Sequence, residues 1–142
     1  MATQTKFQIF ARDVARGKHD FSSHTYKAML TNTAPNAATN SVKADITEIS
    51  AGNGYTAGGP SIGTVTESQS SGTEILKYVN QTITASGGSI GPFRYLVFYN
   101  DTQTTPAKPL VSYVDYGSAI TLADTESLAI NFDGTNGFLQ VA

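Results

Sequence analysis

The side chains best suited to chemistry near neutral pH are two histidines, His19 and His24, the only ones in the chain. Imidazole can bind a metal ion or transfer a proton in this pH range. The odd spacing places the two rings on opposite faces of a strand, and the adjacent Asp20 does not evidently converge on either ring. A metal site would need carboxylates from elsewhere in the chain. We therefore expect exposed or locally hydrogen-bonded imidazoles, and no metal site.

Two glycine-containing stretches resemble ligand-binding loops without matching them. Residues 52–59, Gly-Asn-Gly-Tyr-Thr-Ala-Gly-Gly, have one residue too many for the dinucleotide fingerprint, and the chain has no G-K-[ST]. Residues 133–137, Asp-Gly-Thr-Asn-Gly, lack the full calcium-loop pattern and its terminal Glu. We predict a structural loop in the first stretch and a hairpin turn in the second.

The chain contains no recognisable catalytic motif. Because it has no Cys, disulfides, thiol catalysis and Cys-ligated zinc are all excluded. It contains no G-x-S-x-G or H-E-x-x-H pattern, and nothing selects a pair of its carboxylates for glycoside hydrolysis. The sequence therefore predicts a protein that is not an enzyme, with no catalytic residues and no cofactor.

Seven tyrosines are the remaining side chains of functional interest. Tyr provides a large contact area at low entropic cost and is enriched at protein interfaces. A β surface rich in Tyr, Thr and Asn also suits sugar binding. Alternatively, most of these tyrosines are core or rim residues whose hydroxyl has one partner, and the sequence leaves both interpretations open.

The most apolar stretch, residues 92–100, is predicted to be the inner strand around which the other elements are arranged. It is rich in the aromatic and β-branched residues that suit a pleated sheet. Alternation places one set of side chains on the first face (Phe93, Tyr95, Val97, Tyr99) and another on the second (Arg94, Leu96, Phe98). Both faces can be buried, which is typical of a layered β fold.

Short strands punctuated at intervals near a dozen residues predict an all-β fold, a jelly-roll-like antiparallel sandwich with one short helix. The further strands are expected at residues 25–31, 62–66, 74–79, 81–85, 110–116, 120–122, 127–132 and 138–141. The helix is expected at residues 42–49, where Val42, Ile46 and Ile49 follow the spacing of one helical face. Either Asn40 or Ser41 could cap it.

The beginning of the chain differs in charge from the rest. Residues 1–30 carry five positive and two negative side chains, a net +3, whereas residues 31–142 carry four positive and nine negative, a net −5. A short strand could form at residues 7–10, and a charged loop or arm is expected at residues 12–20. We divide the chain into a basic N-terminal arm or loop, residues 1–24, and a jelly-roll-like β domain, residues 25–142. A basic arm favours an acidic partner, and an ordinary solvated segment is the alternative.

Size and composition fit one soluble domain. A chain of 142 residues can bury a core without covalent staples. Charged residues make up 14%, against about 25% in an average domain, and Thr, Ser and Asn take their place. No signal-peptide pattern and no apolar run of membrane-spanning length is visible, so neither secretion nor a membrane partner is expected.

Four stretches resemble the capsid cement or decoration proteins of tailed bacteriophages, such as that of a Bordetella podophage. They are residues 26–32, 42–59, 87–101 and 115–122, which together extend over most of residues 25–132. The resemblance implies a jelly-roll-like domain on the capsid exterior that bridges capsomers and stabilises the head. It implies the major capsid protein and further copies of the chain as partners, a dimer rather than a trimer, and no nucleic acid. The expected location is the virion, after assembly in the host cytoplasm.

The basic N-terminal segment provides our hypothesis for the capsid interface, which comprises Phe7, Ile9, Phe10, Arg12, Arg16 and Lys18. The apolar members would anchor the segment or pair with a neighbouring sheet edge, and the cations would lie on acidic shell protein. The alternative function is a β-sandwich glycan- or receptor-binding module. Its sign would be an exposed row of aromatic side chains in a groove.

Overall fold

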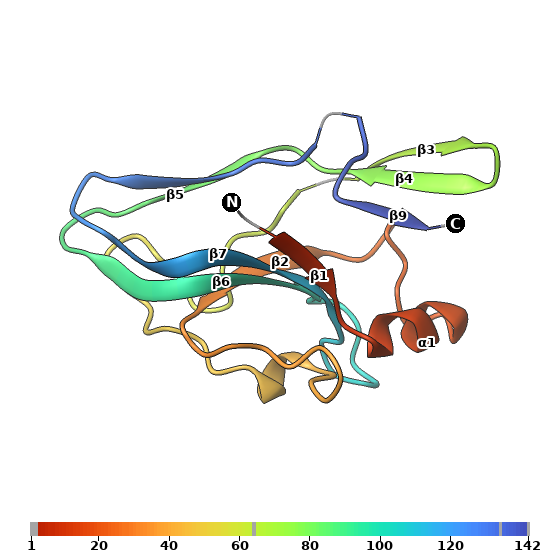
Figure 1. Cartoon of the computed structure of the whole chain (residues 1–142), viewed down its shortest axis with the longest axis horizontal. Helices are drawn as coiled ribbons and strands as arrows, with labels where there is room; N and C mark the ends of the chain where they lie inside the picture. Colours follow the sequence, from red (N-terminus) through yellow and green to blue (C-terminus); the bar gives the residue numbers. More distant parts are fainter. Residues whose placement is uncertain (1–2, 64, 134, 142) are drawn as a thin grey trace.

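The protein is an antiparallel β-sandwich in a computed structural model that describes residues 3–63, 65–133 and 135–141 (Figure 1). One layer is a four-stranded sheet in the order β1-β7-β6-β2, formed by Thr3–Lys6, Leu110–Leu122, Ile90–Asn100 and Tyr26–Thr31. The facing layer contains β3-β4-β9 (Thr66–Ser70, Thr73–Lys77, Leu139–Val141) and the pair β5-β8 (Gln81–Thr84, Ser127–Ile130). A single short α-helix, α1 (Ile9–Ala15), occurs within the described residues. The predicted fold class is therefore confirmed.

The main core lies between the two layers. The four-stranded sheet contributes alternate side chains of β2 and β6, and the facing strands contribute theirs from the other side. Its members include Tyr26, Ala28, Leu30, Leu96, Phe98, Leu76, Tyr78, Ile83, Ile130, Phe138 and Leu139. Each large apolar side chain buried in this way contributes about 1.5–3 kcal/mol to folding. Tyr26, Ala28 and Leu30 therefore form the inward face of β2.

A second, smaller core covers the opposite face of the same sheet. It consists of Phe7, Met29, Val97, Tyr99 and Leu110, with Ile9, Ile46 and Tyr113 packed against it. In Figure 1 the connections from β2 to β3 and from β6 to β7 run beneath this face. Strand β6 is therefore buried on both faces, which confirms the central position predicted for residues 92–100.

The alternation of β6 fails at its beginning. Phe93 belongs to the main core together with Leu96 and Phe98, and not to the face of Val97 and Tyr99. The pairing register with β7 shifts on both sides of Phe93, which pairs with Ile120, whereas Tyr95 pairs with Asp115. Four residues of β7 therefore lie opposite one residue of β6. This bulge breaks the period of two on which the prediction depended.

Several predicted strands are confirmed and others are displaced. Strands expected at residues 25–31, 74–79, 81–85, 127–132 and 138–141 are present as β2, β4, β5, β8 and β9. The strand expected at 62–66 is wrong, because β3 begins only at Thr66, and residue 64 lies outside the described residues. Residues 60–62 bond to β2 instead: the N–H of Ala28 donates to the Pro60 carbonyl, and the N–H of Ile62 donates to the Tyr26 carbonyl. Residues 110–116 and 120–122 were expected as separate strands but form one, β7, since Gly117 adopts a positive φ of 87° within it.

The one helix predicted from the sequence is wrong in position, and the helix that forms was not predicted. The strand expected at residues 7–10 and part of the loop expected at 12–20 are replaced by α1. At residues 42–49 only a 3-10 turn forms, η1 (Lys43–Asp45). There the Asp45 carboxylate accepts hydrogen bonds from the N–H groups of Ser41 and Val42, at 2.8 and 3.1 Å. This local cap stabilises one turn, and the following residues continue in extended conformation.

Candidate partner-binding surface

Helix α1 positions most of the residues predicted to contact a partner. Ala11, Arg12 and Ala15 are good helix formers. The helix stops at Gly17, whose φ of 71° suits the residue that follows a helix. The N–H of Gly17 donates to the carbonyl of Val14 at 3.1 Å, and the N–H of Lys18 donates to that of Asp13 at 2.8 Å. Two hydrogen bonds of this pattern close the helix firmly.

The apolar half of the predicted interface lies in the protein interior. Phe7 and Phe10 are 1% and 4% exposed. Ile9 is half-buried against the second core. Strand β1, directly before them, pairs with β7 from Thr3 opposite Asp115 to Lys6 opposite Ser112. The described part of the predicted N-terminal arm therefore pairs with the sheet and packs into the core of the sandwich. The two buried phenylalanines are unavailable to a partner.

The basic half of the predicted interface is at the surface. Arg12 is exposed on α1 and Arg16 is exposed directly after it, whereas Lys6 is exposed at the end of β1 and Lys18 is half-buried. None of these four cations forms a salt bridge with a described residue. By contrast, the cations of the sandwich body include Lys27, Lys43, Arg94 and Lys108, each of which is paired with a carboxylate. The charge around α1 is thus available to an external partner.

Asp13 is a buried carboxylate close to three of these cations. Its side chain points inward from α1, and the residue is 3% exposed. Burial raises the pKa of Asp13, and the nearby Arg12, Arg16 and Lys18 oppose that rise without cancelling it. Since Oδ2 of Asp13 has no hydrogen-bond partner among the described residues, the carboxylate is not committed to any one of the cations.

A small groove of about 220 Å³ separates α1 from β9. Phe10, Ala11, Val14 and Val141 provide its apolar lining, and Lys6 and Gln140 lie at its polar end. Val141 is one of two large apolar side chains that are exposed within the described residues, with 38% of its surface accessible. An apolar contact is therefore available beside the unpaired cations.

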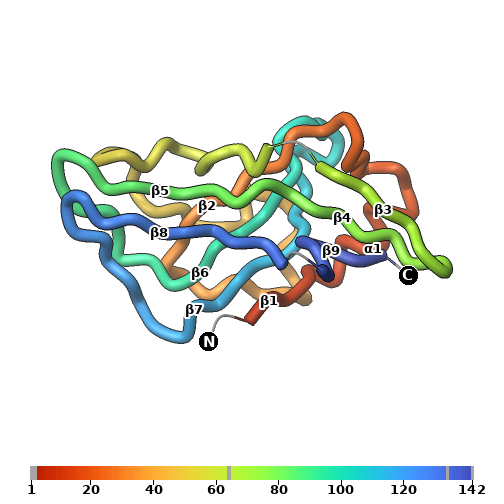
Figure 2. The backbone as a smooth tube through the Cα atoms, turned by 90° about the horizontal axis from the view of Figure 1, so that it is seen from above, coloured from red at the N-terminus to blue at the C-terminus, as the bar shows by residue number. Residues whose placement is uncertain are grey.

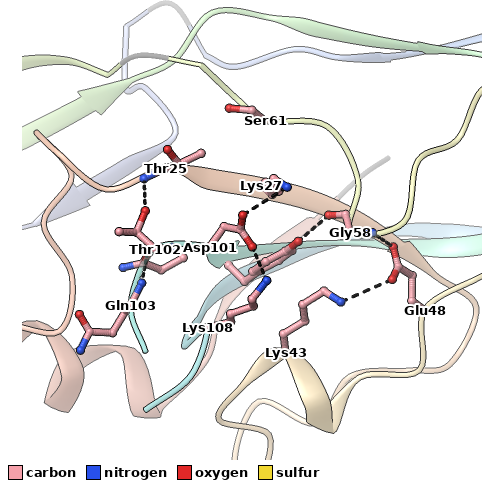
Figure 3. Close-up of polar contacts among 12 residues, drawn as sticks. Thr25, Lys27, Lys43, Glu48, Gly58, Ser61, Asp101, Thr102, Gln103 and Lys108 are labelled. Carbon is pink, nitrogen blue, oxygen red and sulfur yellow. Dashed lines mark hydrogen bonds and ion pairs between the residues drawn. The ribbon is translucent and has the colours of Figure 1, made fainter. Parts of the chain in front are cut away.

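A second polar cluster, on β2 and the loops beside it, is internally paired (Figure 3). Lys27 and Lys108 both contact the Asp101 carboxylate, at 3.2 and 2.7 Å, and Lys43 lies 3.5 Å from Glu48. Burial alone would raise the pKa of Asp101, but hydrogen bonds from Lys108 and Lys27 lower it below its usual value. The Lys27 contact joins β2 to the residue 101–109 loop, and the other two contacts lie within that loop and within the residue 43–59 segment. We therefore assign the cluster a structural role.

The glycine-rich stretch 52–59 is a packed structural loop. A Cβ at Gly59 would lie 1.7 Å from the carbonyl oxygen of Ala28, so the backbone of the loop rests directly on β2. Glu48 accepts hydrogen bonds from the Tyr55 hydroxyl at 2.6 Å and from the N–H of Gly58. The Glu48 carboxylate therefore already accepts hydrogen bonds from donors of this loop. A phosphate site would require such donors to be free.

The histidines are also structural. His19 is buried, with its ring 5.9 Å from those of Phe21 and Tyr26 and its Nδ1 3.2 Å from the Tyr26 hydroxyl. Burial, together with a smaller effect of the neighbouring His24, lowers the pKa of His19 to about 4. Nδ1 of His24 lies 2.8 Å from the amide nitrogen of Asn100. Among the described residues, no three His, Cys, Asp or Glu side chains gather at one point.

Asp133 organises the turn predicted at residues 133–137. Its Oδ1 accepts hydrogen bonds from the N–H groups of Thr135 and Asn136, both at 2.7 Å. These two bonds, with a third from the Asn136 side chain, lower the pKa of Asp133. The carboxylate is thus used within the turn.

Most tyrosines are core residues. Tyr26, Tyr55, Tyr78, Tyr95 and Tyr99 are buried, and Tyr113 and Tyr116 are half-buried. The sequence contained no signal to separate these groups, because all seven occur in or beside predicted strands and loops of similar composition.

Comparisons with known proteins found no match to any family model, curated protein or solved structure. In the described part of the chain, no helix has the length and apolar character needed to cross a membrane.

Proposed function

We propose that the protein is a structural virion component that binds the outside of a tailed-bacteriophage capsid, bridges capsomers and stabilises the head. In this proposal it carries out no reaction and needs no cofactor. Its partners are the major capsid protein and further copies of this chain, most simply one copy in a dimer. The sequence resemblance supports the proposal, and an all-β sandwich is the fold that the resemblance implies.

The observation that carries the proposal is the group of cations around α1 without internal partners. Arg12 lies on a helix anchored by buried Phe10, and Arg16 follows that helix directly before Gly17, so the backbone of both residues is held in place. Binding therefore does not have to order their backbone, and the two cations favour an acidic protein surface. The apolar groove beside them supplies contact area that is not sensitive to salt.

Binding to empty capsids of the phage that carries this gene tests the proposal. We expect the purified protein to sediment with expanded capsids, and less so as salt is raised, because exposed charges are screened. The Arg12→Ala/Arg16→Ala double variant should bind about five- to thirtyfold more weakly, since it loses two charge-assisted contacts of roughly 0.5–1 kcal/mol each.

The matched control is Arg12→Lys/Arg16→Lys, which keeps the charge and should retain most of the binding. Failure of the wild-type protein to sediment with capsids would refute the proposed function. Equal binding by the alanine variant and the wild type would refute only the assignment of α1 as the contact surface.

A further inference from the structure

A cleft of about 330 Å³ opens on the side of the sandwich where the β1–β7 edge faces the connection between β8 and β9. In Figure 2 β8 and β9 follow one another along this side, with β7 and β1 nearby. The cleft exists because β8 ends at Ile130 and β9 begins only at Leu139. The intervening chain turns at Asp133, so the facing layer does not close over the sheet.

The interior of the cleft is apolar and rigid. Leu96, Phe98 and Phe138 form part of its lining and are almost fully buried. The rings of Phe98 and Phe138 lie 4.7 Å apart, and that of Phe132 lies 5.7 Å from Phe138 in an edge-to-face arrangement. Such contacts hold the rings in place. Because Phe132 and Tyr116 are only half-buried, part of each ring is accessible from the cleft.

The cleft is also lined by polar groups that have no hydrogen-bond partner within the described part of the protein. The side chain of Asn131 is exposed and makes no hydrogen bond with a described residue, and neither does the hydroxyl of Tyr116. Gln4 is held in place because its Nε2 donates to Ser112 Oγ at 3.0 Å and to the Phe138 carbonyl at 3.1 Å. Its side-chain carbonyl is left as a further acceptor.

The electrostatics of the cleft favour an uncharged ligand. Among the described residues that line the cleft, Asp133 alone is charged, and backbone N–H groups of its own turn fix its carboxylate and lower its pKa. This carboxylate is exposed and interacts with Lys77, so the lining carries no strong net charge, which suits a neutral ligand. A purely apolar ligand would cover Asn131 and Tyr116 without satisfying them, which costs roughly 1–3 kcal/mol per group.

We propose that this cleft binds a neutral sugar, with one pyranose ring against the accessible faces of Tyr116 and Phe132 and its hydroxyls bonded to Asn131 and Tyr116. A sugar ring has an apolar face and a rim of hydroxyls, which matches an aromatic wall with an amide and a phenol at its edge. The volume is at the lower end of the range for small-molecule sites, so the site holds one or two rings. This site is separate from α1 and does not depend on capsid binding.

The test is NMR titration of the full-length protein with neutral sugars (glucose, galactose, mannose, N-acetylglucosamine), acidic sugars (glucuronic acid, N-acetylneuraminic acid) and an apolar dye. We expect millimolar binding of at least one neutral sugar, with shifts confined to the cleft. Asn131→Ala and Tyr116→Phe should each weaken it roughly five- to tenfold, since each removes one hydrogen-bonding group. Both substitutions are conservative, and unchanged unfolding midpoints would show that the variants remain folded.

Binding of acidic sugars alone, of the apolar dye alone, or of none of the probes would overturn the proposal. So would neutral-sugar binding that both variants retain at full strength. The same two variants should sediment with capsids as the wild type does. This result would distinguish a failure of the sugar site from a failure of the proposed capsid-binding function.

Discussion

Arg94 and Asp115 form a two-point ion pair across the bulge between β6 and β7. Nε of Arg94 lies 2.8 Å from Oδ1 of Asp115, and Nη2 lies 3.0 Å from Oδ2. The same Oδ1 accepts a hydrogen bond from the N–H of Gly117 at 2.8 Å. The bond from Arg94 lowers the pKa of Asp115, and the bond from Gly117 lowers it further. One carboxylate therefore joins the single residue on β6 to the extra residues on β7.

Two substitutions at Asp115 separate its charge from its role as an acceptor. Asp115→Asn keeps an oxygen for the N–H of Gly117 but loses the ion pair, whereas Asp115→Ala loses both. We expect stability to decrease in the order wild type, Asn, Ala, measured as urea midpoints. The gap between wild type and Asn should narrow at high salt because the pair is partly exposed. If high salt narrowed the difference in urea midpoint between the Asn and Ala variants equally, the proposed separation of charge from hydrogen-bond acceptance at Asp115 would be contradicted.

The bulge marks the limit of what alternation could predict on β6. The pattern correctly placed Leu96 and Phe98 opposite Val97 and Tyr99, because these residues pair with β7 or β2 without a large offset. It misplaced Phe93, since the offset there is created on the partner strand. Alternation within one strand contains no information about its neighbour's register.

Substitution of Phe7 tests whether the N-terminal segment belongs to the core. Phe7 is 1% exposed and packs with Met29 and Val97. Phe7→Ala should therefore lower the free energy of unfolding by about 3–5 kcal/mol. The matched control is Gln8→Ala, an exposed neighbour whose change should stay within about 0.5 kcal/mol. Similar small effects of both substitutions, measured by chemical denaturation, would indicate a loosely attached arm.

The sequence did contain a signal for α1 that charge obscured. Residues 11–16, Ala-Arg-Asp-Val-Ala-Arg, are mostly good helix formers with cations toward the end, and Gly17 follows where a helix stop is expected. The spacing of Phe10 and Val14 places them on one helical face. By contrast, the apolar spacing at residues 42–49 predicted a helix that does not form, because Ile46 and Ile49 pack against different cores from chain outside any helix.

No part of the candidate sugar site could be predicted from the sequence. Gln4, Tyr116 and Asn131 are far apart in the chain and occur in no motif. They meet only because β8 and β9 are interrupted opposite the β1–β7 edge. The basic surface was easier to predict, since Arg12, Arg16 and Lys18 are close neighbours in the chain. Predicting that the apolar residues of the same segment are buried would have required recognising the helix.

The pKa of His19 predicts a loss of stability in mild acid. The folded value of about 4 lies below the ordinary value of 6.5, so folding favours the neutral ring. The full contribution of His19 to stability is therefore present above pH 6.5, is lost as the pH falls toward 4, and is constant below that. At pH 4.5 the loss should be of the order of 2–3 kcal/mol relative to pH 7.

His19→Phe provides the matched comparison, because it keeps a ring beside Phe21 and Tyr26 and cannot titrate. We expect the free energy of unfolding of this variant to fall less than that of the wild type between pH 7 and pH 4.5. Asp13, whose pKa burial raises, contributes with the opposite sign in both proteins and cancels in the comparison. Parallel pH profiles for the two proteins would show that His19 is not held neutral by the fold.

Gly59 and Gly72 separate close backbone contact from backbone conformation. Both have a positive φ, 76° and 83°, so Ala at either position adopts an unfavourable conformation that costs about 1–2 kcal/mol. Nothing lies within 4 Å of a Cβ at Gly72, whereas a Cβ at Gly59 meets the backbone of Ala28 and Met29. Since this backbone belongs to paired strand β2 and cannot move aside cheaply, Gly59→Ala should cost at least about 2 kcal/mol more than Gly72→Ala in chemical denaturation. Equal costs would mean that residues 52–59 can move away from the sheet. The hydrogen bond between Tyr55 and Glu48 would then not depend on the packing of this loop against β2.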